Sequence, residues 1–207
     1  MGITSLEDNE TRAQILEKAI NLKAIPVTWF SYPIDPLLIA NLTSAGLKHF
    51  APLTGVFYDL RQEQPYFLVS PHLKLSIAKD VTYFKDFLFI FEQTWNHPQG
   101  YGEFFFKNLL NSTRFIPFVL RHNDTPVGAC VLDIQNEIAG CYWDCVLPAY
   151  RNQGIGRLMV QARLKLAQER GCKNVVAQCL PSSLNVYTNL GFQRACDMAL
   201  FRYSNLA

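Results

Sequence analysis

The fold is decided by the stretch Val146-Leu147-Pro148-Ala149-Tyr150-Arg151-Asn152-Gln153-Gly154-Ile155-Gly156-Arg157. This stretch lies where an apolar run typical of a strand ends and a long amphipathic run typical of a helix begins. Its two glycines let the backbone turn tightly and direct several N–H groups into one concavity. The positive end of the helix dipole and the two arginines add attraction for an anion. The sequence therefore predicts a diphosphate-binding site at this junction.

Two common phosphate-binding patterns do not fit this stretch. It is not the dinucleotide pattern GxGxxG, because Asn152 stands at the position of the first glycine. It is not a P-loop, because no Gly-Lys-Ser or Gly-Lys-Thr follows. Taken without its surroundings, the stretch is also compatible with a plain tight turn between a strand and a helix.

The segments around this stretch predict an α+β, layered fold. Several strands in succession, joined by short polar turns, predict antiparallel hairpins, and a strand-helix-strand unit follows them. This order implies a mixed, mostly antiparallel central sheet with helices on both faces. The expected strands are 73–79, 115–121, 126–134, 138–147, 174–179 and 192–203, and the expected helices are 81–95, 102–111, 154–170 and 183–190.

The long helix at 154–170 has an apolar stripe at helical spacing and ends at Gly171. We expect its buried face to consist of Ile155, Leu158, Met159, Ala162 and Leu166.

The N-terminal third predicts a smaller α/β region. We expect a helix at 6–22, a strand at 25–31, a helix at 36–49 and a strand at 55–60. A polar stretch that ends at Pro65 places the boundary between the two regions around 62–72. The expected domains are therefore an N-terminal extension at 1–65 and a main domain at 73–207.

The main domain carries two motifs in order. The first is V-x-P-x-Y-R-x-x-G-x-G-R at 146–157, and the second is Tyr187-Thr188-Asn189-Leu190-Gly191-Phe192. Together with the strand between them, they resemble the coenzyme A motif and the following motif of the GNAT (GCN5-related N-acetyltransferase) superfamily. The resemblance covers about residues 73–207. It implies the GNAT acyl-CoA N-acyltransferase fold, with acetyl-CoA as co-substrate and no metal.

The resemblance also implies roles for individual residues. Val146 and Leu147 are expected to pair through their backbone with the pantetheine arm, and the N–H of Val146 to polarise the thioester carbonyl. Tyr187 matches the position whose phenol protonates the departing thiolate, although it could also be a plain core aromatic. The diphosphate is expected to bind to the loop residues, mainly through main-chain N–H groups: Arg151, Asn152, Gln153, Gly154, Ile155, Gly156 and Arg157.

Two features depart from the family pattern or are left open by it. An asparagine that often contacts the cofactor is replaced here by Cys179 or Leu180, and Ser182 or Ser183 could substitute for it. The resemblance does not fix a general base, which an alkyl ammonium of pKa about 10 requires before it can attack. Asp144 is the first candidate, because on a strand it shares the face of Val146. The reserve candidates are Asp133, Glu103 and His97.

The N-terminal extension resembles part of the main domain. Thr43-Ser44-Ala45-Gly46-Leu47 matches Thr188-Asn189-Leu190-Gly191-Phe192 at a fixed offset along the chain. We interpret the extension as a possible degenerate copy of the C-terminal GNAT half. Its counterpart of the phosphate loop, residues 6–10, is acidic and would repel a phosphate. The alternative is that any strand-helix-strand piece shows such similarity.

Composition restricts the class of protein. Hydrophobic residues make up 49% and charged residues 17%, which indicates a globular core and excludes a disordered chain. A net charge of only +2, without a basic cluster, argues against a nucleic-acid partner. The six cysteines show no CxxC spacing, so we expect buried free thiols. The N-terminus lacks a secretory pattern and no apolar run is long enough for a bilayer, so we expect a cytoplasmic protein without a membrane partner. We further expect a monomer or a homodimer.

The sequence thus predicts an acyltransferase: an acetyl-CoA-dependent N-acetyltransferase acting on a primary amine of a small molecule or peptide. The amine is expected to attack the thioester directly in a ternary complex. The alternatives are a non-catalytic module that binds or senses acyl-CoA, and a transferase for a longer acyl chain. The sequence does not identify the acceptor, because acceptor pockets are built from variable loops.

Overall fold

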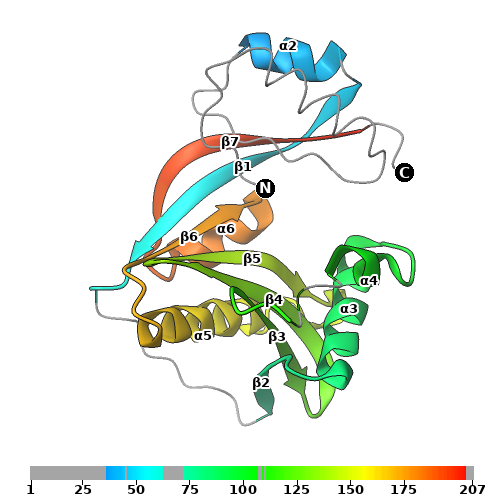
Figure 1. Cartoon of the computed structure of the whole chain (residues 1–207), viewed down its shortest axis with the longest axis vertical. Coiled ribbons are helices and arrows are strands. Elements are labelled where there is room, and N and C mark those ends of the chain that lie inside the picture. Colours follow the sequence, from blue (N-terminus) through cyan, green and yellow to red (C-terminus); the bar gives the residue numbers. More distant parts are fainter. Residues whose placement is uncertain (1–35, 45, 63–71, 107–108, 110, 204–207) are drawn as a thin grey trace. The chain divides into compact units, whose positions relative to one another are not determined.

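The computed structural model describes residues 36–44, 46–62, 72–106, 109 and 111–203 (Figure 1). The packing divides the chain into two compact units. One comprises the chain up to Gly55 together with the part from Cys196 onward, and the other comprises Val56–Ala195. The sequence motifs at 146–157 and 187–192 both lie in the second unit. The expected domain boundary at 62–72 lies almost entirely outside the described residues and stays a prediction.

The described strands form a mixed sheet, as the sequence predicts. Its strand order is β2-β3-β4-β5-β6-β1-β7. The pairs β2–β3, β3–β4 and β4–β5 are antiparallel, and β5–β6 is parallel. The strands are β1 (Leu47–Asp59), β2 (Leu73–Ile77), β3 (Phe115–His122), β4 (Thr125–Gln135), β5 (Ile138–Val146), β6 (Asn174–Cys179) and β7 (Gln193–Tyr203).

The helices begin and end where local chemistry directs. The side chain of Asp80 accepts a hydrogen bond from the N–H of Tyr83 at 2.9 Å and caps α3, and Asn96 in the left-handed region ends it. The described helices are α2 (Pro36–Ser44), α3 (Val81–Trp95), α4 (Tyr101–Phe106), the 3-10 turn η1 (Pro148–Tyr150), α5 (Ile155–Glu169) and α6 (Pro181–Thr188). Helix α4 is shorter than the expected 102–111, because Leu109 and Asn111 already lie in turns.

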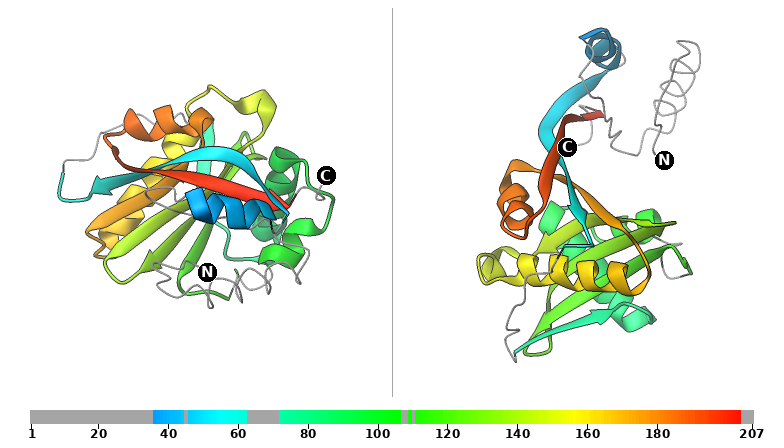
Figure 2. Two further views of the ribbon diagram at one scale, coloured as in Figure 1. Left: turned by 90° about the horizontal axis from the view of Figure 1, so that it is seen from above. Right: turned by 90° about the vertical axis from the view of Figure 1, so that its left-hand side faces the viewer.

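Strands β3–β5 carry a separate hydrophobic cluster on each face. Helix α5 packs on one face, where Val127 and Leu132 of β4 meet Met159 and Leu164 of the helix. Helices α3 and α4 pack on the other face, where Phe87 and Phe106 meet Val131. Figures 1 and 2 show α5 and α3 on opposite sides of these strands. The alternation of the strand side chains between two helix layers confirms the predicted layering.

In the N-terminal region the described residues correct two expectations. The helix expected at 36–49 ends at Ser44, and the strand expected at 55–60 begins at Leu47. The physical reason is Gly46, which lies between the two elements and whose φ of +86° stops the helix. The expected helix at 6–22 and strand at 25–31 lie outside the described residues.

The two segments that resemble each other in sequence have the same local geometry. Helix α2 is followed by Gly46 at φ +86°, and helix α6 is followed by Gly191 at φ +93°. The N–H of Gly46 donates to the carbonyl of Thr43 at 2.9 Å, and that of Gly191 donates to Thr188 at 3.0 Å. The interpretation of the extension as a degenerate copy stays a prediction, supported by this local match.

The buried face of α5 also differs from the expected one. Its buried residues are Ile155, Met159, Val160, Arg163, Leu164 and Ala167. Leu158, Ala162 and Leu166, which we expected on the buried face, are only partly buried. The stripe is rotated because its centre is an arginine, Arg163, which a hydrophobic pattern assigns to solvent.

Helix α5 approaches β4 closely at Gly128. A Cβ atom added there would lie 3.0 Å from Cγ2 of Ile155 and 3.2 Å from Sδ of Met159. A side chain at this position would therefore push the first turns of α5 away from the sheet.

We predict that Gly128→Val lowers the free energy of unfolding by about 1–3 kcal/mol, as overpacking of a core does. Urea denaturation measures this change. Gln135→Val is the control, because it adds a β-branched residue to the exposed end of the same strand. Equal stability of the two variants would contradict the close approach of α5.

Candidate functional site

A β-bulge in β5 shapes the site. Val131 lies opposite Tyr142 and Ala129 lies opposite Cys145, so two residues of β5 face only Cys130. One of these two residues is Trp143, with φ at +53°. The other is Asp144. The extra residue reverses the alternation of the strand after the bulge.

The reversed alternation decides which side chains meet α5. Cys141, before the bulge, belongs to the cluster under α5. Cys145, after the bulge, belongs to the cluster under α3, although the two residues have the same parity. Asp144 and Val146 consequently lie on the α5 side, where Asp144 bonds to that helix and Val146 packs against its cluster.

The backbone of β5 is open on one side after the bulge. The parallel pairing with β6 ends where Cys141 lies opposite Ala177, although β5 continues to Val146. On the other side, the N–H of Leu147 donates to the carbonyl of Val127 at 3.0 Å. Because hydrogen-bonded and non-bonded pairs alternate in an antiparallel ladder, the neighbouring pair Val146 and Gly128 is a non-bonded pair. The N–H and C=O of Val146 therefore point away from β4, toward the side on which β6 has separated.

The loop that follows β5 forms the expected concavity. Gly154, with φ at +80°, is the N-cap of α5, and Asn152 also has a positive φ of +61°. Arg151 donates from Nε to the carbonyl of Val146 at 3.1 Å, and Gln153 donates from Nε2 to the carbonyl of Ala149 at 3.2 Å. These contacts fix the loop to the strand end that it follows.

Space above the glycines is available to a ligand. A Cβ added at Gly154 would have no atom within 4 Å, and one added at Gly156 would meet only Val186, at 3.9 Å and beyond. Arg151, Asn152, Gln153 and Arg157 are exposed, and Ile155 is buried beneath them. The helix N-terminus, the open glycines and the arginines fit a diphosphate.

A buried network connects β5, α5 and α6 behind this strand end. Nη2 of Arg163 donates to Oδ1 of Asp144 at 2.5 Å and to Oη of Tyr187 at 3.3 Å. The hydroxyl of Tyr187 donates in turn to Oδ2 of Asp144. Arg163 also donates from Nε to the carbonyl of Met159 at 3.1 Å and from Nη1 to that of Val131 at 3.2 Å. The structure therefore brings together the two predicted catalytic side chains, Asp144 and Tyr187.

Burial differs among the members of this network. The side chain of Arg163 has no exposed surface, whereas that of Asp144 is 24% exposed. Tyr187 is 3% exposed. Asp144 is thus the member through which a ligand can reach the network most easily.

Burial and neighbouring charges shift the pKa values of Tyr187 and Arg163. Burial raises the pKa of Tyr187 well above its ordinary value, Arg163 opposes the rise and Asp144 adds to it. Burial works against the charge of Arg163, but Asp144 and the neighbouring thiols and phenol raise its pKa overall. These shifts favour the guanidinium of Arg163 and the neutral phenol of Tyr187.

Arg163 is the residue that sequence reasoning missed. Ile155, Met159 and Arg163 follow each other at intervals of four, which places all three on one stripe of the helix. A charged residue on an otherwise apolar stripe indicates a buried partner of opposite charge. Asp144, a charged residue in an apolar strand, was the sequence signal for the partner of Arg163.

The other candidates lie in ordinary surroundings. Ser182 is exposed, and Ser183 donates its hydroxyl to the carbonyl of Leu180 at 3.1 Å. His97 stacks between Phe91 and Tyr101, and burial lowers its pKa.

The two carboxylates among the reserve candidates, Asp133 and Glu103, lie apart from the Arg163 network. Asp133 is bonded to Arg114 at 2.5 and 2.7 Å, and Glu103 is exposed on the first turn of α4. The hydrogen bonds that join Arg163, Asp144 and Tyr187 include neither of these carboxylates.

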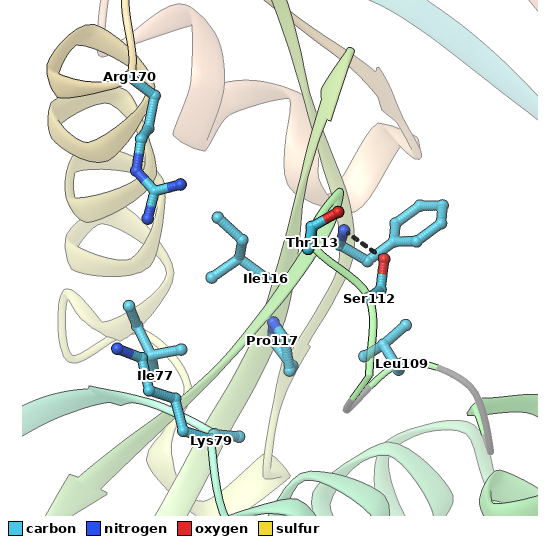
Figure 3. A pocket seen from close by; sticks show the side chains of 10 residues that line it. Ile77, Lys79, Leu109, Ser112, Thr113, Ile116, Pro117 and Arg170 are labelled. Atoms are coloured by element: carbon cyan, nitrogen blue, oxygen red, sulfur yellow. Dashed lines mark hydrogen bonds between the residues drawn. The ribbon is translucent and has the colours of Figure 1, made fainter.

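A separate open cavity of about 300 Å³ lies between the strands β2 and β3 and the C-terminal end of α5 (Figure 3). Its lining includes Ile77, Lys79, Ile116 and Arg170. The backbone groups at that end of α5 are carbonyls, which repel phosphate, so the cavity does not compete with the loop as a diphosphate site.

Two features are absent from the part of the chain that the structure describes. No helix in this part of the chain is long and apolar enough to cross a membrane. No group of three or more His, Cys, Asp or Glu side chains in the same part is arranged to hold a metal ion.

Comparison with known proteins gives a family and a fold. The profile of the Acetyltransferase (GNAT) family matches residues 82–192. Among solved structures, a GCN5-related N-acetyltransferase from Kribbella flavida is similar, with 12% identity, a TM-score of 0.68 and coverage of 93% of this chain and 74% of that one. None of the curated protein sequences matches this chain.

Two further solved structures are of more specifically named proteins. The ribosomal-protein-S18-alanine N-acetyltransferase from Escherichia coli has 19% identity and a TM-score of 0.53, with coverage of 65% of this chain and 99% of that one. The protein AAC(6')-Iy in complex with the bisubstrate analog CoA-S-monomethyl-acetylneamine has 18% identity and a TM-score of 0.52, with coverage of 59% and 91%. At these identities the similarity shows the fold.

We predict that Arg163→Met lowers the free energy of unfolding by about 3–5 kcal/mol, because it leaves the Asp144 carboxylate without its buried partner. Urea denaturation measures this loss. Lys165→Met, at an exposed position of the same helix, is the control and is expected to change stability little. The double variant Arg163→Met with Asp144→Leu is expected to recover much of the loss, because no unpaired charge remains. A single variant as stable as the control would contradict the ion pair.

Proposed function

The chain belongs to the GNAT acetyltransferase family, and on this premise we propose that it transfers an acetyl group from acetyl-CoA to a primary amine. The amine attacks the thioester directly while both substrates are bound. The acceptor is a small molecule or a peptide.

One observation carries the proposal: the N–H and C=O of Val146 face the side on which β6 no longer pairs with β5. An amide-bearing arm such as pantetheine can form hydrogen bonds with a strand edge at which the neighbouring strand has separated. The C=O of Val146 accepts there from the exposed side chain of Arg151. The loop with its open glycines lies at the end of the same strand, so one extended ligand can contact both. A free phosphate would use only the loop.

The loop residues would hold the diphosphate of coenzyme A. The main-chain N–H groups around Gly154 and Gly156 and the dipole of α5 supply most of the attraction. Arg151 and Arg157 add charge at the entrance. The exposed Ser182 is placed on the first turn of α6 and stays a proposed contact, as does Ser183.

The chemistry requires two proton transfers and one charge stabilisation. The N–H of Val146 donates to the thioester oxygen as negative charge develops there. Asp144 accepts the proton of the attacking amine, and Tyr187 gives a proton to the departing thiolate. A carbon–nitrogen bond forms, a carbon–sulfur bond breaks, and the products are an acetamide and a free thiol.

Two of the similar structures support an amine acceptor without naming it. One is the ribosomal-protein-S18-alanine N-acetyltransferase, and the other is AAC(6')-Iy in complex with the bisubstrate analog CoA-S-monomethyl-acetylneamine. For this chain we therefore propose both acceptor classes, a peptide and a small molecule.

The proposed function is tested by acetyl-CoA-dependent release of free thiol with a panel of amines. The panel comprises polyamines, amino acids, aminoglycosides and lysine peptides. Release with one class of amine is expected. Binding of acetyl-CoA without release for any amine would contradict transfer and favour the acyl-CoA-binding or sensing module. A larger rate with longer acyl-CoAs would replace the donor while keeping the reaction.

We predict that acetyl-CoA raises the melting temperature by several degrees. At about a hundred times its dissociation constant a ligand stabilises the fold by about 2.7 kcal/mol, and each kcal/mol moves the melting temperature of such a chain by about 2–4 °C. Arg151→Glu together with Gly154→Asp is expected to abolish the shift, because it repels the diphosphate and fills the open space. Arg170→Glu, at the other end of α5, is the control and keeps the shift. A shift that survives the double substitution would place the ligand elsewhere.

We predict that Tyr187→Phe lowers kcat by about 10- to 1000-fold, as the loss of a general acid does. Affinity for acetyl-CoA, measured by calorimetry, is expected to change little because the ring remains. Tyr58→Phe is the matched control: Tyr58 and Tyr187 are 2% and 3% exposed, and both rings contact Phe192. An unchanged kcat in Tyr187→Phe would make this tyrosine a plain core aromatic.

A further inference from the structure

The proposed acid and base are directly bonded to each other. The hydroxyl of Tyr187 donates to Oδ2 of Asp144, so its proton points to the carboxylate and not to a ligand. The other carboxylate oxygen, Oδ1, accepts from Arg163 at 2.5 Å. An acid and a base that act independently would not share a proton in this way.

We propose that Asp144 and Tyr187 act as one proton relay from the attacking amine to the departing sulfur, and that Arg163 is the positioning residue that holds both. This inference rests on the proposed function, because it needs an amine and a thioester at the end of β5. It goes beyond that function by making the two transfers parts of a single path.

The relay balances protons and charges. The amine attacks in its neutral form, after its ammonium has released one proton to the solvent. The nitrogen forms its bond to the carbonyl carbon and then loses a second proton to Asp144. Tyr187 gives its proton to the sulfur as the carbon–sulfur bond breaks, and receives the proton of Asp144 through their shared hydrogen bond. Asp144 returns to a carboxylate and Tyr187 to a phenol, so one proton has moved from nitrogen to sulfur. No other reactant is consumed.

The relay removes a charge conflict that separate roles would create. If Tyr187 alone gave up its proton, a phenolate would lie against the carboxylate of Asp144. Two like charges in hydrogen-bond contact are strongly unfavourable in a buried site. When the proton of Asp144 passes to Tyr187 in the same event, no state with both groups negative is formed.

Arg163 is placed to hold both members of the relay. Its Nη2 donates to Oδ1 of Asp144 and to Oη of Tyr187, and carbonyls of Met159 and Val131 fix the rest of the guanidinium. It has no exposed surface, so it acts through these two side chains and not on a ligand. Its bond to Oη is expected to strengthen whenever the phenol loses proton density.

The remaining groups near the pair do not compete for the proton. The titratable neighbours are thiols: Cys130 on β4, Cys141 and Cys145 on β5, and Cys179 on β6. Burial raises the pKa of Cys141 to about 11 and those of Cys145 and Cys179 to about 12. Burial also raises the pKa of the Cys130 thiol. These neighbours therefore stay neutral, and Asp144 is the proton acceptor among them.

The relay is tested by a double-mutant cycle on kcat. Asp144→Asn and Tyr187→Phe are each expected to lower kcat by about 10- to 1000-fold. Because residues that act as a unit are not additive, the double variant is expected to lose no more than about the larger single loss. Losses that multiply would mean an independent acid and base, and would overturn the relay.

Two control substitutions match the pair. Asp86→Asn removes another carboxylate that is 24% exposed and bonded to an arginine, Arg121. Tyr58→Phe removes another buried phenol. Each is expected to leave kcat close to that of the unaltered chain.

The positioning role of Arg163 is tested by two substitutions. Arg163→Lys keeps a positive charge and is expected to retain part of kcat, whereas Arg163→Met is expected to lose about as much as Asp144→Asn. Both variants are expected to keep the affinity for acetyl-CoA, measured by calorimetry, because Arg163 acts through Asp144 and Tyr187 and not on a ligand. Full kcat in both variants would make Arg163 structural only. If neither Arg163 variant folds, the cycle between Asp144 and Tyr187 still decides the relay.

The protein without substrate gives an independent readout. The hydrogen bond between Asp144 and Tyr187 predicts that their substitutions are coupled in melting temperature, so the double variant is expected to fall by less than the sum of the two single changes. Additive changes would contradict the bond itself. Calorimetry with acetyl-CoA separates the two proposals: a chain that binds it and releases thiol, but with multiplying losses, contradicts only the relay. A chain that releases no thiol with any amine contradicts the proposed function and the relay together.

Discussion

The site depends on the buried ion pair between Arg163 and Asp144. A charged side chain without exposed surface, such as that of Arg163, needs a partner of opposite charge inside the fold. Its partner is Asp144, which a regular strand would turn toward α3 and not toward α5. The bulge at Trp143 supplies the extra residue that reverses the alternation. The buried ion pair therefore requires the bulge, and the bulge is stabilised by the pair. Tyr187 completes the arrangement from α6, so three separate elements are fixed by one set of hydrogen bonds.

The same bulge links structure to the proposed chemistry. Beyond it β5 no longer pairs with β6, and the N–H and C=O of Val146 are turned to that side. The strand edge that can bind a pantetheine arm and the side chains that can move protons are thus set by one local irregularity. The glycine loop then continues directly into α5, the helix that carries Arg163. The loop proposed to bind phosphate, the N–H of Val146 and the side chains of Asp144 and Arg163 thus lie on a continuous piece of chain from 140 to 165, and Tyr187 joins them from α6.

Most of the architecture could be predicted from the sequence, because it depends on local signals. Helix α3 begins and ends at the predicted residues, since Asp80 caps it and Asn96 ends it. Strand β6 also has the predicted bounds, and the hairpins of β3–β5 follow from their turns. The prediction of a helix that reaches residue 49 was wrong, because Gly46, with its positive φ, ends α2. The family profile confirms the resemblance seen in the two motifs.

The network of the site could be predicted only in part. The strand pattern and the second motif predicted Asp144 and Tyr187 as site residues. Their hydrogen bond depends on a bulge that no local sequence pattern predicts. Arg163 was missed because a hydrophobic pattern places an arginine in solvent, and its burial depends on a partner from another element. The roles of these residues and of the loop stay predictions.

The most direct test of the account is the backbone amide signal of Val146 in a ¹H–¹⁵N spectrum of the labelled protein. The account predicts that acetyl-CoA shifts this signal strongly downfield, because the N–H gains the thioester oxygen as acceptor. Coenzyme A without the acetyl group is expected to shift the amides of Asn152–Gly156 equally and that of Val146 much less. Equal effects of the two ligands on Val146, or no effect of either, would contradict the placement of the reacting carbonyl at the end of β5.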